Sequence, residues 1–343
     1  MKLRSVMFLA VFVGLLSSCS KSGSTGNTDT APTNLVVSAV VTTNNSGNVS
    51  FTASANNAVS YDFDYGNGIF QTVTSGIITY KYPVSGTYTV NVIAKSAGGQ
   101  TISKSIQVTV IVVLTLFWSD EFNTAGTPDP SKWGYDIGTG TGGWGNAELE
   151  YYTSRPDNVI VSGGTLKIIA KAESFLGSAY TSARLLTKNK FSFQYGKIDL
   201  SAKLPSGVGT WPALWMLGDN ISTVGWPNCG EIDIMEHRGS ELNKIYGTVH
   251  YPGHSGSNGD VTTTVISNAA TAFHKYTLEW DPGYIKFSVD DVAFKTFVNS
   301  GSLPFNQNLF LILNVAMGGN FGGSVDPAFT SATLEIDYIR VYH

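Results

Sequence analysis

Short segments in which apolar and polar residues alternate recur along most of this chain, and Gly, Pro, Asn or Asp residues separate them. In Thr87–Val92, for example, Tyr88, Val90 and Val92 fall on one face, because side chains alternate sides along a strand. No amphipathic helical stretch of useful length accompanies these segments. The pattern therefore predicts an all-β protein built from sandwiches of paired strands.

Length and charge limit the organisation of the chain and its partners. A chain of 343 residues is long enough for two folded units. Its formal net charge is −4, and the part from Phe117 to the end has 15 basic against 22 acidic side chains. Because nucleic-acid binding needs clustered cations, we exclude a nucleic-acid partner.

The N-terminus predicts export. A short apolar stretch preceded by basic residues suits a signal peptide, and the following Leu16-Ser17-Ser18-Cys19 resembles a bacterial lipobox. We expect a signal peptide at 1–18, a polar tether at 19–31, and a lipid on Cys19 that anchors the exported protein to the bacterial outer membrane or cell surface. The alternative is an ordinary secretory signal. Cys229 is then left without a disulfide partner and is interpreted as an apolar filler.

Residues 32–110 are predicted to form the first, smaller unit. The segments Tyr61–Gly68 and Tyr82–Val90 resemble the PKD domain, a small immunoglobulin-like β-sandwich often attached to exported polysaccharide-degrading enzymes. Tyr61 and Asp64 stand where the usual motif has Trp and Gly. Because the unit has no catalytic constellation, we expect a spacer or a weak sugar-binding module.

Residues 117–343 are predicted to form the second, larger unit. The alternating segments Tyr284–Val289 and Ala293–Phe297 flank Asp290-Asp291, which is typical of a tight hairpin turn. Many such strands must pair and each must bury one face. An antiparallel sandwich of two sheets is the architecture that meets both demands.

Three acids lie within six residues of an otherwise apolar strand, Glu231-Ile232-Asp233-Ile234-Met235-Glu236. A buried, unpaired carboxylate loses several kcal/mol of hydration, so these acids must face away from the core. In a regular strand Glu231 and Asp233 share a face and Glu236 points to the other one. A one-residue bulge near Ile234-Met235 brings it back. We therefore expect a row of three carboxyls on one face of a sheet.

Two such carboxyls, about 5–5.5 Å apart, suit a retaining glycosidase. One attacks the anomeric carbon and the other protonates the departing oxygen. The acid must keep its proton near neutral pH, and neighbouring negative charge and partial desolvation both raise its pKa.

The run of acids has the form E-x-D-x-x-E and resembles the signature of glycoside hydrolase family 16, in its β-bulge branch. Other segments extend the resemblance over about two-thirds of the chain, in the order of the family: Trp118–Phe122, Gly143–Asn146, Tyr151–Thr153, Ser182–Leu185, Tyr195–Lys197, Trp211–Gly218, Gly247–Tyr251 and Leu313–Asn320. The resemblance implies a concanavalin-like β-jelly-roll in which Glu231 is the nucleophile, Glu236 the acid/base and Asp233 the assisting acid.

The same resemblance implies a set of sugar contacts: Asn146, Arg184, Trp211, Trp215, Trp226 and His250. Trp211 and Trp215 lie four apart on a strand and so share a face, and indole rings stack well on pyranose rings. Three alternatives remain open: core packing for any one Trp, an ion pair with an acid for Arg184, and a packed, hydrogen-bonded side chain for His250.

Catalysis of this kind needs no cofactor. The resemblance does imply a candidate structural calcium site on the side of the sandwich away from the acids. Its ligands would be Glu121, a carbonyl near Gly164, and Asp337, and oxygen ligands suit a hard cation. A surface ion pair is the alternative for these side chains.

The substrate prediction rests on charge and on two loops. A sulfated polysaccharide calls for Lys and Arg near the site, which this acidic unit lacks. The segments Trp226–Glu231 and Gly318–Phe321 resemble the laminarinase group. We therefore predict a monomeric, retaining endo-β-1,3-glucanase that also acts on β-1,3-1,4-glucan. The alternatives are a hydrolase of another neutral polysaccharide such as agarose, and a protein that binds β-glucan without hydrolysing it.

Overall fold

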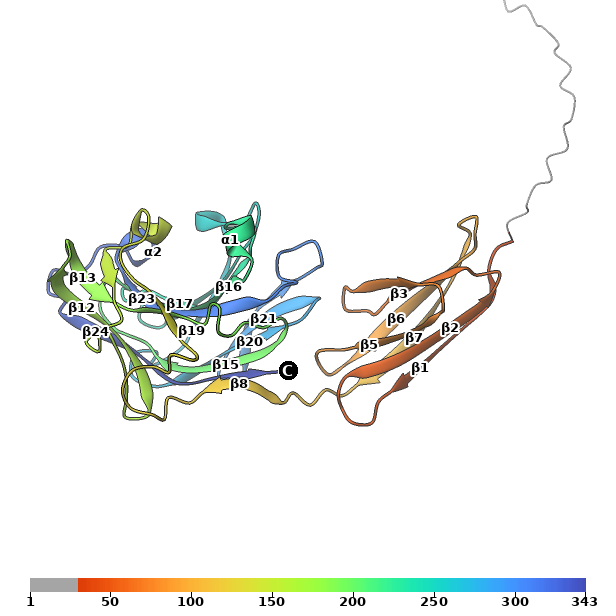
Figure 1. Cartoon of the computed structure of the whole chain (residues 1–343), viewed down its shortest axis with the longest axis horizontal. Helices are drawn as coiled ribbons and strands as arrows, with labels where there is room; N and C mark the ends of the chain where they lie inside the picture. Colours follow the sequence, from red (N-terminus) through yellow and green to blue (C-terminus); the bar gives the residue numbers. More distant parts are fainter. Residues whose placement is uncertain (1–29) are drawn as a thin grey trace, which may run out of the picture.

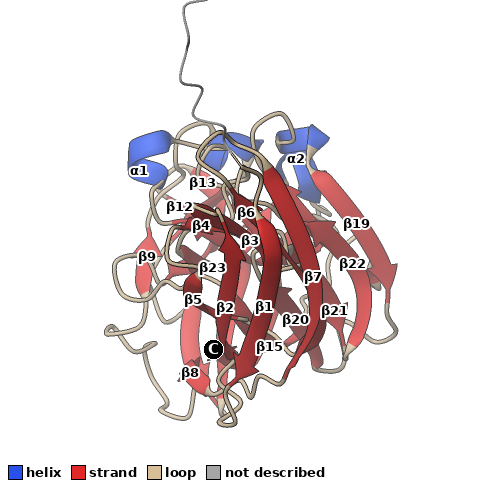
Figure 2. Cartoon of the chain, turned by 90° about the vertical axis from the view of Figure 1, so that its right-hand side faces the viewer, coloured by secondary structure: helices blue, strands red, loops and turns tan. Residues whose placement is uncertain are grey.

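The computed structural model describes residues 30–343, which form two β-sandwiches (Figure 1). Strands make up nearly all of the regular structure (Figure 2), so the all-β prediction is confirmed. The predicted signal peptide and Cys19 lie outside the described residues. Among the residues that are described, no helix has the length and apolar character needed to cross a membrane.

The smaller sandwich packs a three-stranded sheet on a four-stranded sheet. The first has the order β1 (Thr33–Val41), β2 (Asn48–Asn56), β5 (Ile77–Lys81), and the second β4 (Phe70–Val73), β3 (Ser60–Asp64), β6 (Gly86–Lys95), β7 (Thr101–Val110). Their inner faces share a core rich in aromatic rings, in which Phe51, Phe63, Tyr65 and Tyr82 are fully buried.

The larger sandwich begins at β8 and contains a ten-stranded and a seven-stranded sheet. The ten-stranded sheet holds β8 (Leu116–Asp120), β10 (Glu150–Tyr152), β11 (Val159–Ser162), β12 (Thr165–Phe175), β13 (Ser178–Ser182), β15 (Gly196–Lys203), β20 (His274–Trp280), β21 (Tyr284–Val289), β22 (Val292–Val298) and β24 (Ser331–Tyr342). Its pairs are antiparallel except β10 with β13. Val289 pairs with Val292, and the two residues between them, Asp290 and Asp291, both have positive φ, as the predicted hairpin turn requires.

The seven-stranded sheet carries the acids. Its order is β19 (Asp260–Val265), β18 (Lys244–His250), β17 (Glu231–His237), β16 (Thr210–Gly218), β23 (Leu309–Met317), β14 (Arg184–Leu186), β9 (Gly134–Asp136). One face packs against the ten-stranded sheet in a common core that includes Leu214 and Ile232 from this sheet and Leu278 and Ile336 from the other.

Four short helical segments interrupt the loops of the larger sandwich: η1 (Gly143–Ala147), α1 (Ile221–Val224), η2 (Gly256–Asn258) and α2 (Gly319–Gly322). In Figure 1, α1 and α2 both lie above the seven-stranded sheet, on the side away from the ten-stranded sheet. The loops that carry them therefore border the outer face of the seven-stranded sheet.

Candidate active site

Strand β17 contains one extra residue relative to its neighbours. Leu214 and Trp215, consecutive on β16, pair with Met235 and Asp233, so Ile234 has no partner on that strand. The register against β18 shifts at the same place. Ile234 and Met235 both pack into the core although they are adjacent in the chain. The predicted bulge is confirmed, and it returns the third acid of the run to the face of the first two.

Glu236 is held by a donor from each neighbouring strand. Trp211 Nε1, on β16, donates to Oε1 at 3.0 Å, and Thr248 Oγ1, on β18, donates to Oε2 at 3.1 Å. The residue is 8% exposed. Its carboxyl therefore has a fixed orientation on the outer face of the sheet.

Glu231 and Asp233 meet around one histidine. Trp226 Nε1, from the loop before β17, donates to Oε2 of Glu231 at 3.0 Å. His250 Nε2, on β18, lies 3.7 Å from Oε1 of Glu231 and 3.3 Å from Oδ2 of Asp233. Trp226 is 45% exposed, so its ring is accessible beside the first acid.

Burial raises the pKa of all three acids. The pKa of Glu231 rises to about 8, mainly through desolvation and then through the charge of Asp233. Desolvation and the charge of Glu236 raise the pKa of Asp233 well above its usual range. The pKa of Glu236 is also raised by burial, against the lowering effect of its two hydrogen-bond donors. Because burial and mutual repulsion raise all three pKa values, the carboxyls do not all ionise together, and the site holds at least one proton near neutral pH.

Arg184 lies on the same face, but its guanidinium is occupied by the protein itself. Its Nε is 3.1 Å from Oδ2 of Asp136, and it stacks 4.7 Å from the ring centre of Trp144 and 4.9 Å from that of Trp215. Arg184 therefore forms an ion pair with an acid, Asp136, which was the alternative to a sugar contact. One face of the Trp215 ring is covered by Arg184, which reduces the area it offers to a sugar.

A chain of hydrogen bonds links Asn146 to Trp215. Trp215 Nε1 donates to Asn314 at 2.8 Å, Asn314 Nδ2 to the Tyr152 hydroxyl at 3.0 Å, and that hydroxyl to Glu148 Oε2 at 2.9 Å. Asn146 Nδ2 donates to the other oxygen of Glu148 at 3.4 Å. Two predicted sugar contacts are therefore coupled through residues that sequence reasoning did not select.

An aromatic group beside Glu236 was also missed. Phe321, in α2, lies 5.1 Å from Trp211 and 5.0 Å from Tyr246 between ring centres, and the Arg238 guanidinium is 3.9 Å from the centre of the Phe321 ring. The segment Gly318–Phe321 stands out in the sequence, but its place next to the acids depends on how the sheet folds.

The predicted calcium ligands come together only in part. Strand β24 pairs with both β8 and β12, so Glu121, just after β8, and Gly164, just before β12, both lie near the part of β24 that holds Asp337. However, both oxygens of Glu121 accept hydrogen bonds from Arg340, at 2.8 and 2.9 Å. Glu121 therefore forms the ion pair that was the alternative and has no carboxylate oxygen free of Arg340. Among the described residues, Asp337 accepts only one hydrogen bond, from Ser201 at 3.4 Å. The calcium site stays a prediction.

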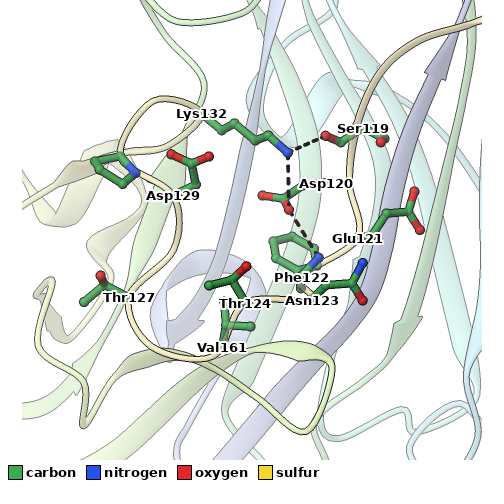
Figure 3. Close-up of a pocket in the computed structure, with 11 residues that line it drawn as sticks. Ser119, Asp120, Glu121, Phe122, Asn123, Thr124, Thr127, Asp129, Lys132 and Val161 are labelled. Carbon is green, nitrogen blue, oxygen red and sulfur yellow. Dashed lines mark hydrogen bonds and ion pairs between the residues drawn. The ribbon is translucent and has the colours of Figure 1, made fainter.

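A hollow of about 470 Å³ lies apart from the three acids, around the segment that follows β8 (Figure 3). Lys132 reaches across it, donates to the Ser119 carbonyl at 2.7 Å and pairs with Asp120 at 3.5 Å. Asp120 also accepts hydrogen bonds from the Phe122 N–H and the Trp133 indole. These charges stabilise the loop, and we assign no chemistry to this hollow.

Comparison with known proteins identifies both sandwiches. The model of glycosyl hydrolases family 16 matches residues 147–340, and the PKD domain model matches residues 34–110. A beta-glucanase of Rhodothermus marinus is 46% identical over 243 residues, covering 66% of this chain and 84% of that protein. The PKD resemblance of the smaller unit is confirmed.

Solved structures match the larger sandwich closely. The laminarinase from Rhodothermus marinus has a TM-score of 0.65 at 45% identity, and the match covers 67% of this chain and 98% of that one. The laminarinase catalytic domain from Thermotoga maritima MSB8 has a TM-score of 0.63 at 42% identity, with the same coverage of both chains. The jelly-roll with its bulged acidic strand, and the sequence that builds it, show that this chain belongs to glycosyl hydrolase family 16.

Proposed function

We propose that this chain is a retaining endo-β-1,3-glucanase of the laminarinase type. The observation that carries the proposal is the bulged strand, which puts Glu231 and Glu236 on one face with separate hydrogen-bond donors. The beta-glucanase and laminarinases to which the chain is similar support the same activity.

In the proposed first step, Glu231 attacks the anomeric carbon and Glu236 gives its proton to the departing glycosidic oxygen, which leaves a glycosyl-enzyme. In the second step Glu236 takes a proton from water, and that water displaces Glu231 with overall retention. Asp233, between the two, interacts with both acids: its charge raises the pKa of Glu231, and the charge of Glu236 raises its own pKa, so the three carboxyls keep a proton among them.

The hydrogen bonds are suited to this division of roles. Burial raises the pKa of Glu231 to about 8 in the free site, so Glu231 must lose a proton before it attacks. The Trp226 N–H can only donate, so it stabilises the ionised carboxylate that then forms. The Thr248 hydroxyl can donate to ionised Glu236 or rotate and accept a hydrogen bond from its protonated form. Glu236 is therefore the better placed of the two to gain and lose a proton during the cycle.

The proposed substrate is a neutral β-1,3-glucan, with β-1,3-1,4-glucan as a second one. The acidic larger unit supports this choice, since a sulfated chain would be repelled. The test is product analysis after incubation with laminarin, barley glucan, agarose and carrageenan. We expect oligosaccharides from laminarin and little release from agarose or carrageenan. The reverse preference would remove the substrate proposal, and no release from any of them would favour a binding protein.

The location remains a separate proposal, because Cys19 lies outside the described residues. We propose that the exported protein is anchored by lipid on Cys19. Metabolic labelling with a fatty acid tests this, with Cys19→Ala as the unlabelled control. A wild-type chain that takes up no label would contradict the anchor.

A further inference from the structure

Glu231, Asp233 and His250 bring three metal-ligating atoms close together. One ligand atom from each lies within 4.8 Å of the other two. Nε2 of His250 is 3.3 Å from Oδ2 of Asp233 and 3.7 Å from Oε1 of Glu231. A tetrahedral ion with metal–ligand distances of about 2.0–2.1 Å holds its ligand atoms about 3.3–3.4 Å apart. The His250–Asp233 separation therefore matches a tetrahedral site, and the His250–Glu231 separation exceeds it by about 0.3 Å, which a small side-chain movement would remove.

The ligand atoms are available. Oδ2 of Asp233 accepts no hydrogen bond within the described part of the chain, although the residue is only 4% exposed. Trp226 binds the other oxygen of Glu231 and leaves Oε1 free of it. Lys295, the cation whose charge acts on Asp233, has its amine bound to the side chain of Asp260 at 2.9 Å. A cation would complete the surroundings of this buried carboxylate oxygen of Asp233, which accepts no hydrogen bond from the described residues and lies 3.3 Å from the His250 imidazole.

We propose that Glu231, Asp233 and His250 form a binding site for a divalent transition-metal ion, Zn²⁺, and that the bound ion inhibits the enzyme by occupying the nucleophile. The inhibition, but not the binding, rests on the proposed function. One imidazole nitrogen and two carboxylate oxygens suit Zn²⁺, whereas Ca²⁺ takes six to eight oxygen ligands. Nδ1 of His250 has no described hydrogen-bond partner, so the site lacks the outer support of a structural zinc centre, and binding is reversible.

Direct binding is tested with Co²⁺ as a spectroscopic probe, on the full chain without an affinity tag. We expect one Co²⁺ per chain with the visible absorption of a four-coordinate ion, lost when Zn²⁺ is added. His250→Asn and Asp233→Asn should each weaken Co²⁺ binding by at least about tenfold. The matched control is His274→Asn, because His274 pairs with a single carboxylate, Asp290, at 2.7 Å and should not contribute.

Inhibition is tested by laminarin hydrolysis at several Zn²⁺ concentrations. We expect the Zn²⁺ concentration for half inhibition to rise with laminarin concentration, and a chelator to restore activity. Binding of Co²⁺ that is unchanged in both His250→Asn and Asp233→Asn, or that is lost in His274→Asn, would overturn the site. Binding at the site without competition by laminarin would overturn the inhibition. The absorption measurement needs no glucanase activity, so failure of the proposed function would leave it interpretable.

Discussion

The two sandwiches treat buried polar groups differently. In the smaller one, the fully buried Tyr82 directs its hydroxyl to the carbonyl of Tyr65 at 3.1 Å, and the Asp62–Lys95 ion pair lies at the surface. In the larger one, three carboxyls with raised pKa values crowd one face of a sheet, and Oδ2 of Asp233 has no described hydrogen-bond partner. The first arrangement favours stability, and the second leaves binding capacity for a ligand.

This difference locates function within the chain. Like charges held together out of water cost free energy that neutral residues would save. A protein can retain such a cluster of acids where the acids act on a substrate. Among its described residues, the smaller sandwich has no similar cluster of buried acids. The predictions below test this contrast, from the largest expected effect to the smallest.

Removal of the nucleophile should have the largest effect. We expect Glu231→Ala to lower kcat on β-glucan by about four orders of magnitude or more, with KM little changed, because the covalent route is lost while the sugar contacts remain. Steady-state kinetics on laminarin measures this. With azide and an activated β-glycoside, the variant should yield the α-glycosyl azide. A β-azide from Glu231→Ala would reverse the assignment of the two acids.

Removal of the acid should depend on the leaving group. Glu236→Ala should lose several orders of magnitude on laminarin, because a sugar alkoxide leaves poorly without a proton. An aryl glycoside with an acidic phenol should recover much of the first-step rate. Azide should then speed turnover and give the β-glycosyl azide. Equal losses on the two substrates would contradict a general-acid role.

The acids should also destabilise the fold as pH rises. Since the pKa of Glu231 rises from 4.5 to about 8 on folding, its protonated form contributes stability that is present below pH 4.5 and is lost as pH rises toward about 8. Because glutamine does not ionise, Glu231→Gln should not show this loss of stability as the pH rises. We expect its free energy of unfolding relative to wild type to increase by roughly 2–4 kcal/mol between pH 5 and pH 8.

Denaturant titration at the two pH values measures that difference. The matched control is Glu121→Gln, because hydrogen bonds from Arg340 lower the pKa of Glu121. Glu121 contributes stability above its unfolded pKa, so its replacement should destabilise the protein at pH 8 and matter less in acid. An identical pH dependence of stability in Glu231→Gln and wild type would contradict the raised pKa.

Each sandwich has a buried tyrosine whose hydroxyl forms hydrogen bonds, Tyr152 in the larger and Tyr82 in the smaller, so replacement by Phe can be compared in the two units. Tyr152→Phe removes the hydroxyl between Glu148 and Asn314, and so frees the residue that fixes the Trp215 indole. We expect kcat/KM on laminarin to fall about tenfold, which corresponds to roughly 1.4 kcal/mol of transition-state stabilisation. If Tyr152→Phe kept full activity and changed only the stability, this chain of hydrogen bonds would have a structural role and no role in catalysis.

Tyr82→Phe removes a buried hydroxyl from the smaller sandwich. Because the hydrogen bond to the Tyr65 carbonyl is lost, we expect the smaller sandwich to lose about 1 kcal/mol of stability. Laminarin hydrolysis at a temperature where both units are folded should not change. A loss of activity in Tyr82→Phe would show that the smaller sandwich contributes to catalysis and would break the contrast.

The order of residues along the chain was enough to predict the fold class, a hairpin turn and the bulge in the acidic strand. Alternating segments predicted the sandwiches, and Asp290-Asp291 predicted a hairpin, because turns and strand faces depend on neighbouring residues. The bulge near Ile234-Met235 followed from the cost of burying a charged side chain. These inferences need only the order of residues along one strand.

The surroundings of the acids were decided by the tertiary structure. Asn314 meets Tyr152 although 162 positions separate them, and the bond from Trp215 to Asn314 spans 99 positions. The position of Arg184 between two Trp rings likewise depends on which strands become neighbours. The sequence pattern identifies side chains that can bind a sugar or form an ion pair. The strand order within the sheet determines which of these side chains are neighbours, because contacts across a sheet do not depend on separation in sequence.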